Sequence, residues 1–115
     1  ATANDEGMEI LLYCHHDDQW TERKGYSVNI ELSGLVSDNA TVDIYQVDED
    51  NCNAHTKWKE IGSPDYPEGD DKKKLVEAGK FKTIVSKGIL DIDDKSTQIQ
   101  ISLPVHAVSL IKINY

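Results

Sequence analysis

Two segments of the chain alternate between apolar and polar residues, and this alternation limits the fold more than any other feature. Val28, Ile30 and Leu32 are separated by polar residues, and residues 98–103 repeat the pattern with isoleucine and leucine. A period of two places one set of side chains on a buried face of a strand and the other set in solvent. The chain therefore contains half-buried β-strands.

Further strand candidates follow at short intervals along the chain. They are residues 8–14, 42–47 and 107–113, with weaker candidates at 83–85 and 88–92. Turn-forming residues such as those at 37–39 lie between them, because Ser, Asp and Asn side chains bond to their own backbone. Strands with this spacing favour an antiparallel sheet over a parallel one. We expect a mostly β protein, an antiparallel β-sandwich of about 7–9 strands.

Residues 48–80 interrupt this pattern, since they show no period of two and contain two of the 3 prolines. Asn53 can cap a helix that ends at Gly62, and a second helix can run over residues 69–78 with acidic residues at its start. A connection of about 33 residues far exceeds the ~4–6 expected between sandwich strands. We therefore expect a helical insertion between central strands, with a functional or interfacial role.

The size and charge of the chain exclude several classes of protein. With 115 residues, the chain is expected to form one domain over residues 1–115, and a (β/α)₈ barrel of about 250 residues does not fit. The net charge of −9 argues against nucleic acid and anionic membranes as partners. No apolar stretch approaches the ~18 residues of a membrane span. No leader is visible at Ala1, so we expect a cytoplasmic protein, or a secreted one whose signal was removed.

Candidate metal and redox sites are weak. His15 and His16 precede two aspartates, but neighbouring residues of a strand point to opposite faces. We predict no metal and no cofactor, and expect this loop to make polar contacts with a neighbouring domain. Cys14 and Cys52 are too few for a disulfide framework, and one bridge or two free thiols both remain open.

The two tryptophans are candidates for sugar stacking or for packing. Trp20 lies in the polar loop that reaches Gly25, where surface stacking and packing against another domain are equally open. Trp58 has Ile61 three residues later in a helical segment. We expect it to be buried as the anchor of the insertion, or to lie at an interface.

Three blocks of sequence resemble the C-terminal β-sandwich of glycoside hydrolase family 39, which contains the β-xylosidases and α-L-iduronidases. They read YCHHDD at 13–18, VDEDNCNAHTKWKEIGSP at 47–64 and LPVHAVSLI at 103–111. The similarity runs from about Met8 to Ile113. Residues 67–74, which follow the second block, are more charged than is usual in the family.

The resemblance implies a non-catalytic accessory domain that packs on a catalytic (β/α)₈ barrel outside this chain. The family's two catalytic glutamates lie on that barrel, so no catalytic residue is carried over, and we expect the chain alone not to be an enzyme. A retaining glycosidase holds two carboxyl groups roughly 5–5.5 Å apart, one with a raised pKa. Acidic runs such as residues 48–50 are instead typical of solvated faces.

The residues expected to contact the barrel, or a sugar, are His15, His16, Trp20, Asn53, His55 and Trp58. Two alternatives stay open. A carbohydrate-binding module would bind a xylo-oligosaccharide or another glycan through a coplanar row of exposed aromatic residues. The candidates for that row are Trp20, Trp58, Tyr26, Tyr45 and Tyr66. An interaction domain for another protein would select its partner through the acidic surface. A buried Trp58 beside a large exposed apolar patch would favour the accessory domain.

Overall fold

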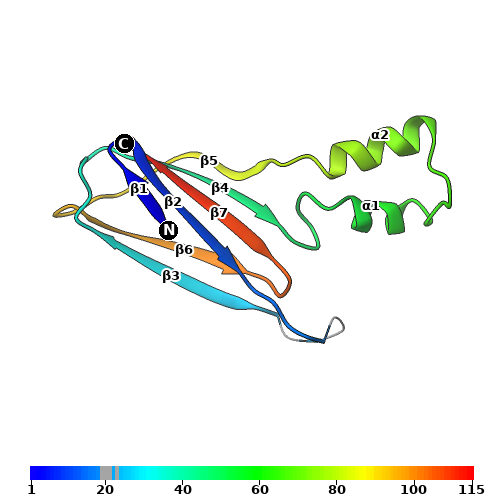
Figure 1. Ribbon diagram of the computed structural model, residues 1–115, viewed down its shortest axis with the longest axis horizontal. Coiled ribbons are helices and arrows are strands. Elements are labelled where there is room, and N and C mark those ends of the chain that lie inside the picture. The colour runs from blue at the N-terminus through cyan, green and yellow to red at the C-terminus, as the bar shows by residue number, and fades with distance from the viewer. Residues whose placement is uncertain (19–21, 23) are drawn as a thin grey trace.

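The computed structural model describes residues 1–18, 22 and 24–115, and it shows a β-sandwich with a pair of helices that projects from one end (Figure 1). The large sheet has the strand order β1-β2-β7-β4-β5, and the small sheet pairs β3 with β6. All paired strands are antiparallel. The elements are β1 (Thr2–Asn4), β2 (Gly7–Tyr13), β3 (Tyr26–Ser33), β4 (Thr41–Val47), α1 (Ala54–Glu60), α2 (Gly69–Ala78), β5 (Thr83–Ile89), β6 (Ser96–Leu103) and β7 (Val108–Asn114). The predicted antiparallel, mostly β fold is confirmed, with seven strands in the described part.

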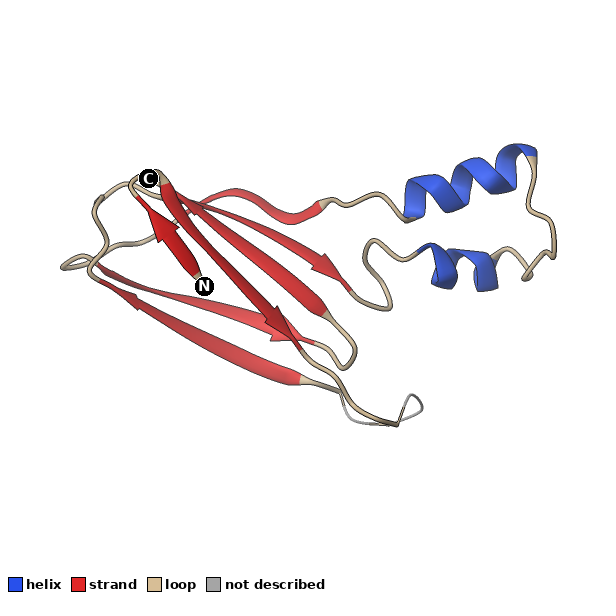
Figure 2. Ribbon diagram, in the orientation of Figure 1, coloured by secondary structure: helices blue, strands red, loops and turns tan. Residues whose placement is uncertain are grey.

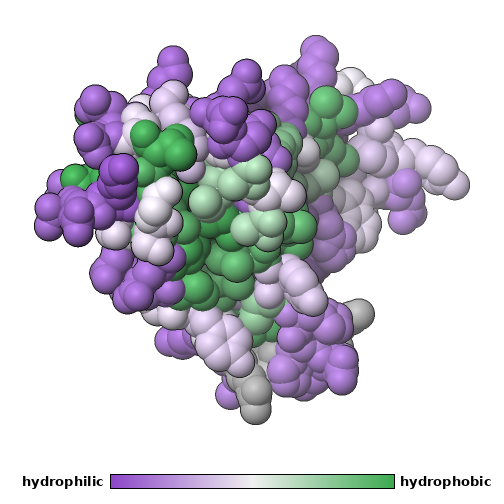
Figure 3. All heavy atoms as spheres, turned by 60° about the vertical axis from the view of Figure 1, so that its left-hand side comes forward, coloured by the Kyte–Doolittle hydropathy of each residue, from purple (hydrophilic) through white to green (hydrophobic). Residues whose placement is uncertain are grey.

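The core lies between the two sheets, and the alternation of the sequence explains which residues fill it. Every second residue of β6 is buried, and the same holds for β4 and β7. The buried core residues are Ile10, Leu32, Leu35, Ala40, Val42, Ile44, Leu90, Ile99, Ile101, Ile111 and Ile113. A two-stranded sheet covers only part of a five-stranded one. Figure 3 shows the molecule with the end opposite the helices turned forward. In this view, apolar side chains reach the surface in a hollow surrounded by polar groups.

The edge of the large sheet differs from the expectation. The sequence predicts two short strands at 83–85 and 88–92, but the structure has one irregular strand, β5, which pairs with β4 through two shifts of register. Lys87 has a positive φ of 51°, and its backbone N–H donates to Asp43 Oδ1 at 2.8 Å. An extra residue in one strand moves the following side chains to the other face. The bulge therefore interrupts the alternation of apolar and polar residues in the sequence of β5.

The insertion forms two short helices, as predicted, and joins the inner strand β4 to the edge strand β5. The Asn53 side chain caps α1, and α2 begins at Gly69 and is followed by Gly79. Neither helix contains a buried residue. The helices pack against each other and extend beyond the sheets (Figure 2). No helix of the described residues has the length and apolar character needed to cross a membrane.

This projection gives the molecule an elongated shape. Its extents are 55 × 32 × 20 Å and its radius of gyration is 17.2 Å. A compact domain of about 100 residues has a radius of gyration of about 13 Å. Both chain termini lie in the half of the molecule away from the helices (Figure 1). The helical pair, residues 54–78, is called the helical hairpin below.

Candidate functional site

The two segments predicted to meet a partner leave the large sheet at the same end. β2 ends at Tyr13, before the histidine loop, and β4 ends at Val47, before the insertion. Both residues are paired with Val108 at the start of β7, one on each side. The points at which the chain leaves β2 and β4 are therefore two strand spacings apart, about 10 Å.

Asp48 organises the start of the insertion. Its side chain is buried, with 6% exposed, although the sequence assigned the whole acidic run to a solvated face; that assignment is wrong for Asp48. Gln46 Nε2 donates to Asp48 Oδ2 at 2.5 Å, and the backbone N–H groups of Asp50 and Asn51 donate to Oδ1 at 2.8 and 2.7 Å. Ser109 Oγ donates to Gln46 Oε1 at 2.7 Å. The polar network therefore joins the insertion to β7 inside the sandwich.

The hydrogen bonds also determine the protonation state of Asp48. Burial by itself raises the pKa of this carboxyl, but the bonds from Gln46, Asn51 and Asp50 outweigh burial and lower the pKa below its ordinary value. Hydrogen bonds to the charged form favour that form. Asp48 is therefore a structural carboxylate, whereas a general acid requires a raised pKa.

Three of the predicted site residues lie together around α1. Asn53 Oδ1 accepts from the backbone N–H groups of His55 and Thr56, at 3.0 and 3.3 Å, and its Nδ2 donates to the Asp48 carbonyl at 2.9 Å. The His55 and Trp58 rings stack with centroids 5.7 Å apart. Trp58 Nε1 donates to the Pro64 carbonyl at 2.9 Å. Trp58 is half-buried rather than buried, and its bond ties α1 to the loop that follows.

The remaining predicted residues belong to the histidine loop. His15 lies edge-on to His106, with centroids 5.6 Å apart, and its Nε2 is 3.5 Å from Asp17 Oδ1. His16 Nδ1 accepts from the Asp18 backbone N–H at 3.0 Å. Trp20 lies outside the described residues. Residues 1–18, 22 and 24–115 contain no group of three or more His, Cys, Asp or Glu that could hold a metal ion.

The two cysteines are free thiols in this structure. Cys52 Sγ accepts from the Lys82 backbone N–H at 3.3 Å, which brings the start and the end of the insertion together. On α2, Glu77 pairs with Lys80 and Lys82, both at 2.5 Å, and these partners lower the pKa of Glu77 to about 2. The base of the helical hairpin is therefore closed by polar contacts.

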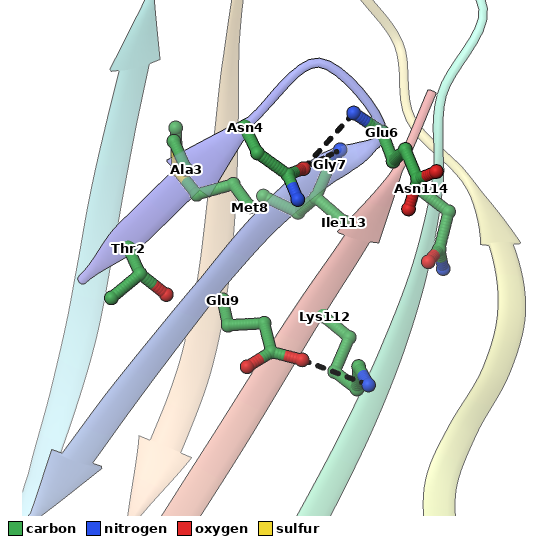
Figure 4. A pocket seen from close by; sticks show the side chains of 10 residues that line it. All are labelled: Thr2, Ala3, Asn4, Glu6, Gly7, Met8, Glu9, Lys112, Ile113 and Asn114. Atoms are coloured by element: carbon green, nitrogen blue, oxygen red, sulfur yellow. Dashed lines mark hydrogen bonds and ion pairs between the residues drawn. The ribbon is translucent and has the colours of Figure 1, made fainter.

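A groove of about 340 Å³ lies at the opposite end of the sheet, between the β1–β2 turn and β7. Figure 4 shows Asn4 Oδ1 accepting from the backbone N–H groups of Glu6 and Gly7, and Glu9 paired with Lys112 at 2.8 Å. The other lining residues are Thr2, Ala3, Met8, Ile113 and Asn114. This lining offers no aromatic face for stacking on a sugar ring.

The exposed tyrosines lie on three separate segments. Tyr13 ends β2 in the large sheet, Tyr26 begins β3 in the small sheet, and Tyr66 lies between the two helices. A carbohydrate-binding platform of the predicted kind requires a row on one face. Tyr13 and Tyr45 both belong to the large sheet, but Tyr26 and Tyr66 lie on other segments, so these four tyrosines do not form one row.

The outer face of the large sheet carries apolar residues that the sequence analysis did not predict to form a contact surface. We call Leu11, Tyr13, Tyr45, Val47, Val108 and Leu110 the outer apolar patch. Leu11 is 61% and Tyr13 is 74% exposed. The signal was present in residues 8–13, which are apolar on both faces of the strand except for Glu9. A strand that is apolar on both faces is typical of burial on both faces.

Comparison with known proteins assigns the family. The sequence profile of glycosyl hydrolases family 39 matches residues 2–91, which is most of the chain. The chain belongs to family 39. No curated protein matches it significantly.

Solved structures of family 39 enzymes share the fold of this chain. A family 39 enzyme from Xanthomonas axonopodis pv. citri superposes with a TM-score of 0.84 at 8% identity, over 97% of this chain and 24% of its own. A monomeric β-xylosidase from Caulobacter crescentus CB15 gives 0.76 at 15% identity, over 96% and 24%. A bacterial orthologue of human α-L-iduronidase gives 0.75 at 19% identity, over 95% and 20%. The chain thus spans about a fifth to a quarter of these enzymes.

Proposed function

We propose that this chain is a single, non-catalytic accessory domain of a larger family 39 glycoside hydrolase. In this proposal it packs on and supports a catalytic (β/α)₈ barrel of the same polypeptide. The observation that carries the proposal is the coverage: nearly all of the chain aligns with only 20–24% of three family 39 chains. A barrel needs about 250 residues, so it must lie in the remaining part.

The chemistry of the chain supports a non-catalytic role. Asp48 is buried, but donors occupy both of its oxygens and its pKa is lowered. A glycosidase acid has the opposite properties, a raised pKa and a free edge that faces the sugar. The structural role of Asp48, at the root of the insertion, is consistent with an accessory domain.

We further propose that the helical hairpin and the histidine loop contact the barrel. The residues involved are His15, His16, Asn53, His55 and Trp58, together with Trp20, which lies outside the described residues. Support comes from the hairpin itself, because its helices bury no residue against this chain. An interdomain interface is more polar than a core, which suits histidine and asparagine.

Activity assays test the proposal. The purified chain is incubated with an aryl β-xyloside and an aryl α-iduronide, beside the parent enzyme that contains the barrel. We expect turnover by the parent and none above buffer for the chain alone. Turnover by the chain that survives repurification, and that disappears when one of its acids is mutated, would overturn the proposal.

A further inference from the structure

We infer that the outer apolar patch is the face on which the catalytic domain of the same enzyme docks. This inference rests on the proposed function and adds the contact surface to it. It differs from the contacts proposed above, because the patch lies on the sheet and not on the hairpin or the histidine loop.

The strand register makes the patch continuous. Leu11, Leu110 and Tyr45 are directly opposite one another across β2, β7 and β4. Tyr13, Val108 and Val47 form the next row in the same three strands. Their sequence neighbours in β4 and β7 point into the core, so these six side chains share the outer face. The result is a grid of two rows and three strands with no charged residue inside it.

The borders of the patch are well defined. Toward the chain termini, the next row holds Glu9, Lys112 and Asp43, and the Glu9–Lys112 ion pair closes that side at 2.8 Å. Toward the hairpin, the exposed Phe81 stacks on Tyr45 with ring centroids 4.8 Å apart. Because Phe81 follows α2, the apolar surface continues into the base of the hairpin.

The patch alone is smaller than an interdomain contact. Strand spacing and rise give the grid a footprint of roughly 200 Å². Interdomain interfaces bury about 600–1,500 Å². An interdomain contact here therefore requires additional area around the patch, and the hairpin, which ends shortly before Phe81, is the adjoining element.

Charge favours the catalytic domain over a second copy of this chain as the partner of the outer apolar patch. Face-to-face dimerisation of two copies would place the same patch and its borders against each other. One border carries Glu9, Lys112 and Asp43, and the other carries Glu49 and Asp50, which follow Val47. Each copy would therefore bring more acidic than basic groups to the contact, and like charges repel. The net charge of −9 per copy adds to that repulsion. A catalytic domain with an apolar patch and basic residues at its rim fits this face.

Calorimetry of the parent enzyme tests the inference. The variants are Leu11→Lys and Val108→Lys, whose side chains are 61% and 42% exposed, so each should leave the unfolding midpoint of the isolated chain nearly unchanged. The control is Ile89→Lys in β5, which is 88% exposed and pairs with Thr41 beyond the charged row. In the parent, we expect both patch variants to lower the midpoint of the sandwich by several degrees, to that of the isolated chain, while the control does not.

The outcomes separate this inference from the proposed function. If the wild-type sandwich is stabilised in the parent and the patch variants leave that stabilisation intact, the docking face is wrong and the accessory role stands. An equal loss with Ile89→Lys also overturns the docking face. If the wild-type sandwich melts at the same temperature with and without the barrel, the supporting role itself fails. A dimer of the isolated chain in sedimentation, dissociated by Leu11→Lys, would assign the face to a second copy and overturn the inference.

Discussion

At the scale of single residues, the buried carboxylate of Asp48 stabilises the turn in which the chain leaves β4. Its oxygens accept from Gln46, Asn51 and the Asp50 backbone. Removing such a partner leaves buried donors unsatisfied, which costs about 1–3 kcal/mol. In Asp48→Asn, one acceptor becomes an NH₂ group that faces other donors. We expect the free energy of unfolding at pH 7, measured with urea, to fall by about that amount.

The lowered pKa of Asp48 gives this prediction a pH dependence. A carboxyl whose pKa is lower in the folded state stabilises the fold above its unfolded pKa of about 3.9. That contribution is lost as the pH falls through the folded pKa. The difference between wild type and Asp48→Asn should therefore be constant above about pH 5 and shrink below about pH 4. The exposed Asp50→Asn is the control, and a wild-type advantage that grows on acidification would contradict the assignment.

At the scale of elements, the helical hairpin is an appendage of the sandwich. Its helices contain no buried residue, and the contact between Cys52 and Lys82 holds the two ends of the insertion together. Replacing residues 54–80 by a short Gly-Ser linker should lower the free energy of unfolding by less than about 1 kcal/mol, because no core contact is lost. Ile111→Ala, at a fully buried position, should cost about 2–5 kcal/mol. A deletion as damaging as Ile111→Ala would show that the hairpin supports the core.

At the scale of the whole molecule, local stability should decrease with distance from the core. Segments with few buried contacts open most easily. In hydrogen exchange on the chain alone, we expect residues 54–78 and the loop peptide 14–18 to exchange fastest and β4 and β7 slowest. In the parent enzyme, protection of the first two segments should rise if the barrel covers them, as proposed above. Unchanged protection of both would place the contact elsewhere on the molecule.

Much of the fold follows from short-range patterns in the sequence. The alternation in β3 and β6 predicts their buried faces, because a strand repeats every two residues. Asn53 predicts the start of α1, because its side chain satisfies backbone donors within three residues. β5 was predicted less well, since its bulge at Lys87 shifts the repeat. The short, exposed β1 has no pattern that could predict it.

The sequence by itself determined the family, most of the strands, both helices and the position of the insertion, because these depend on local periodicity, capping and motifs. Only the tertiary structure decided what the side chains meet. Asp48 belongs to an acidic run in the sequence, yet it is buried and bonded to Gln46. Gln46 in turn accepts from Ser109, which pairing with β7 brings to β4. Leu11, Leu110 and Tyr45 are far apart in the chain and become one row because three strands pair in that register. Strand pairing is non-local, so no segment read alone can contain it.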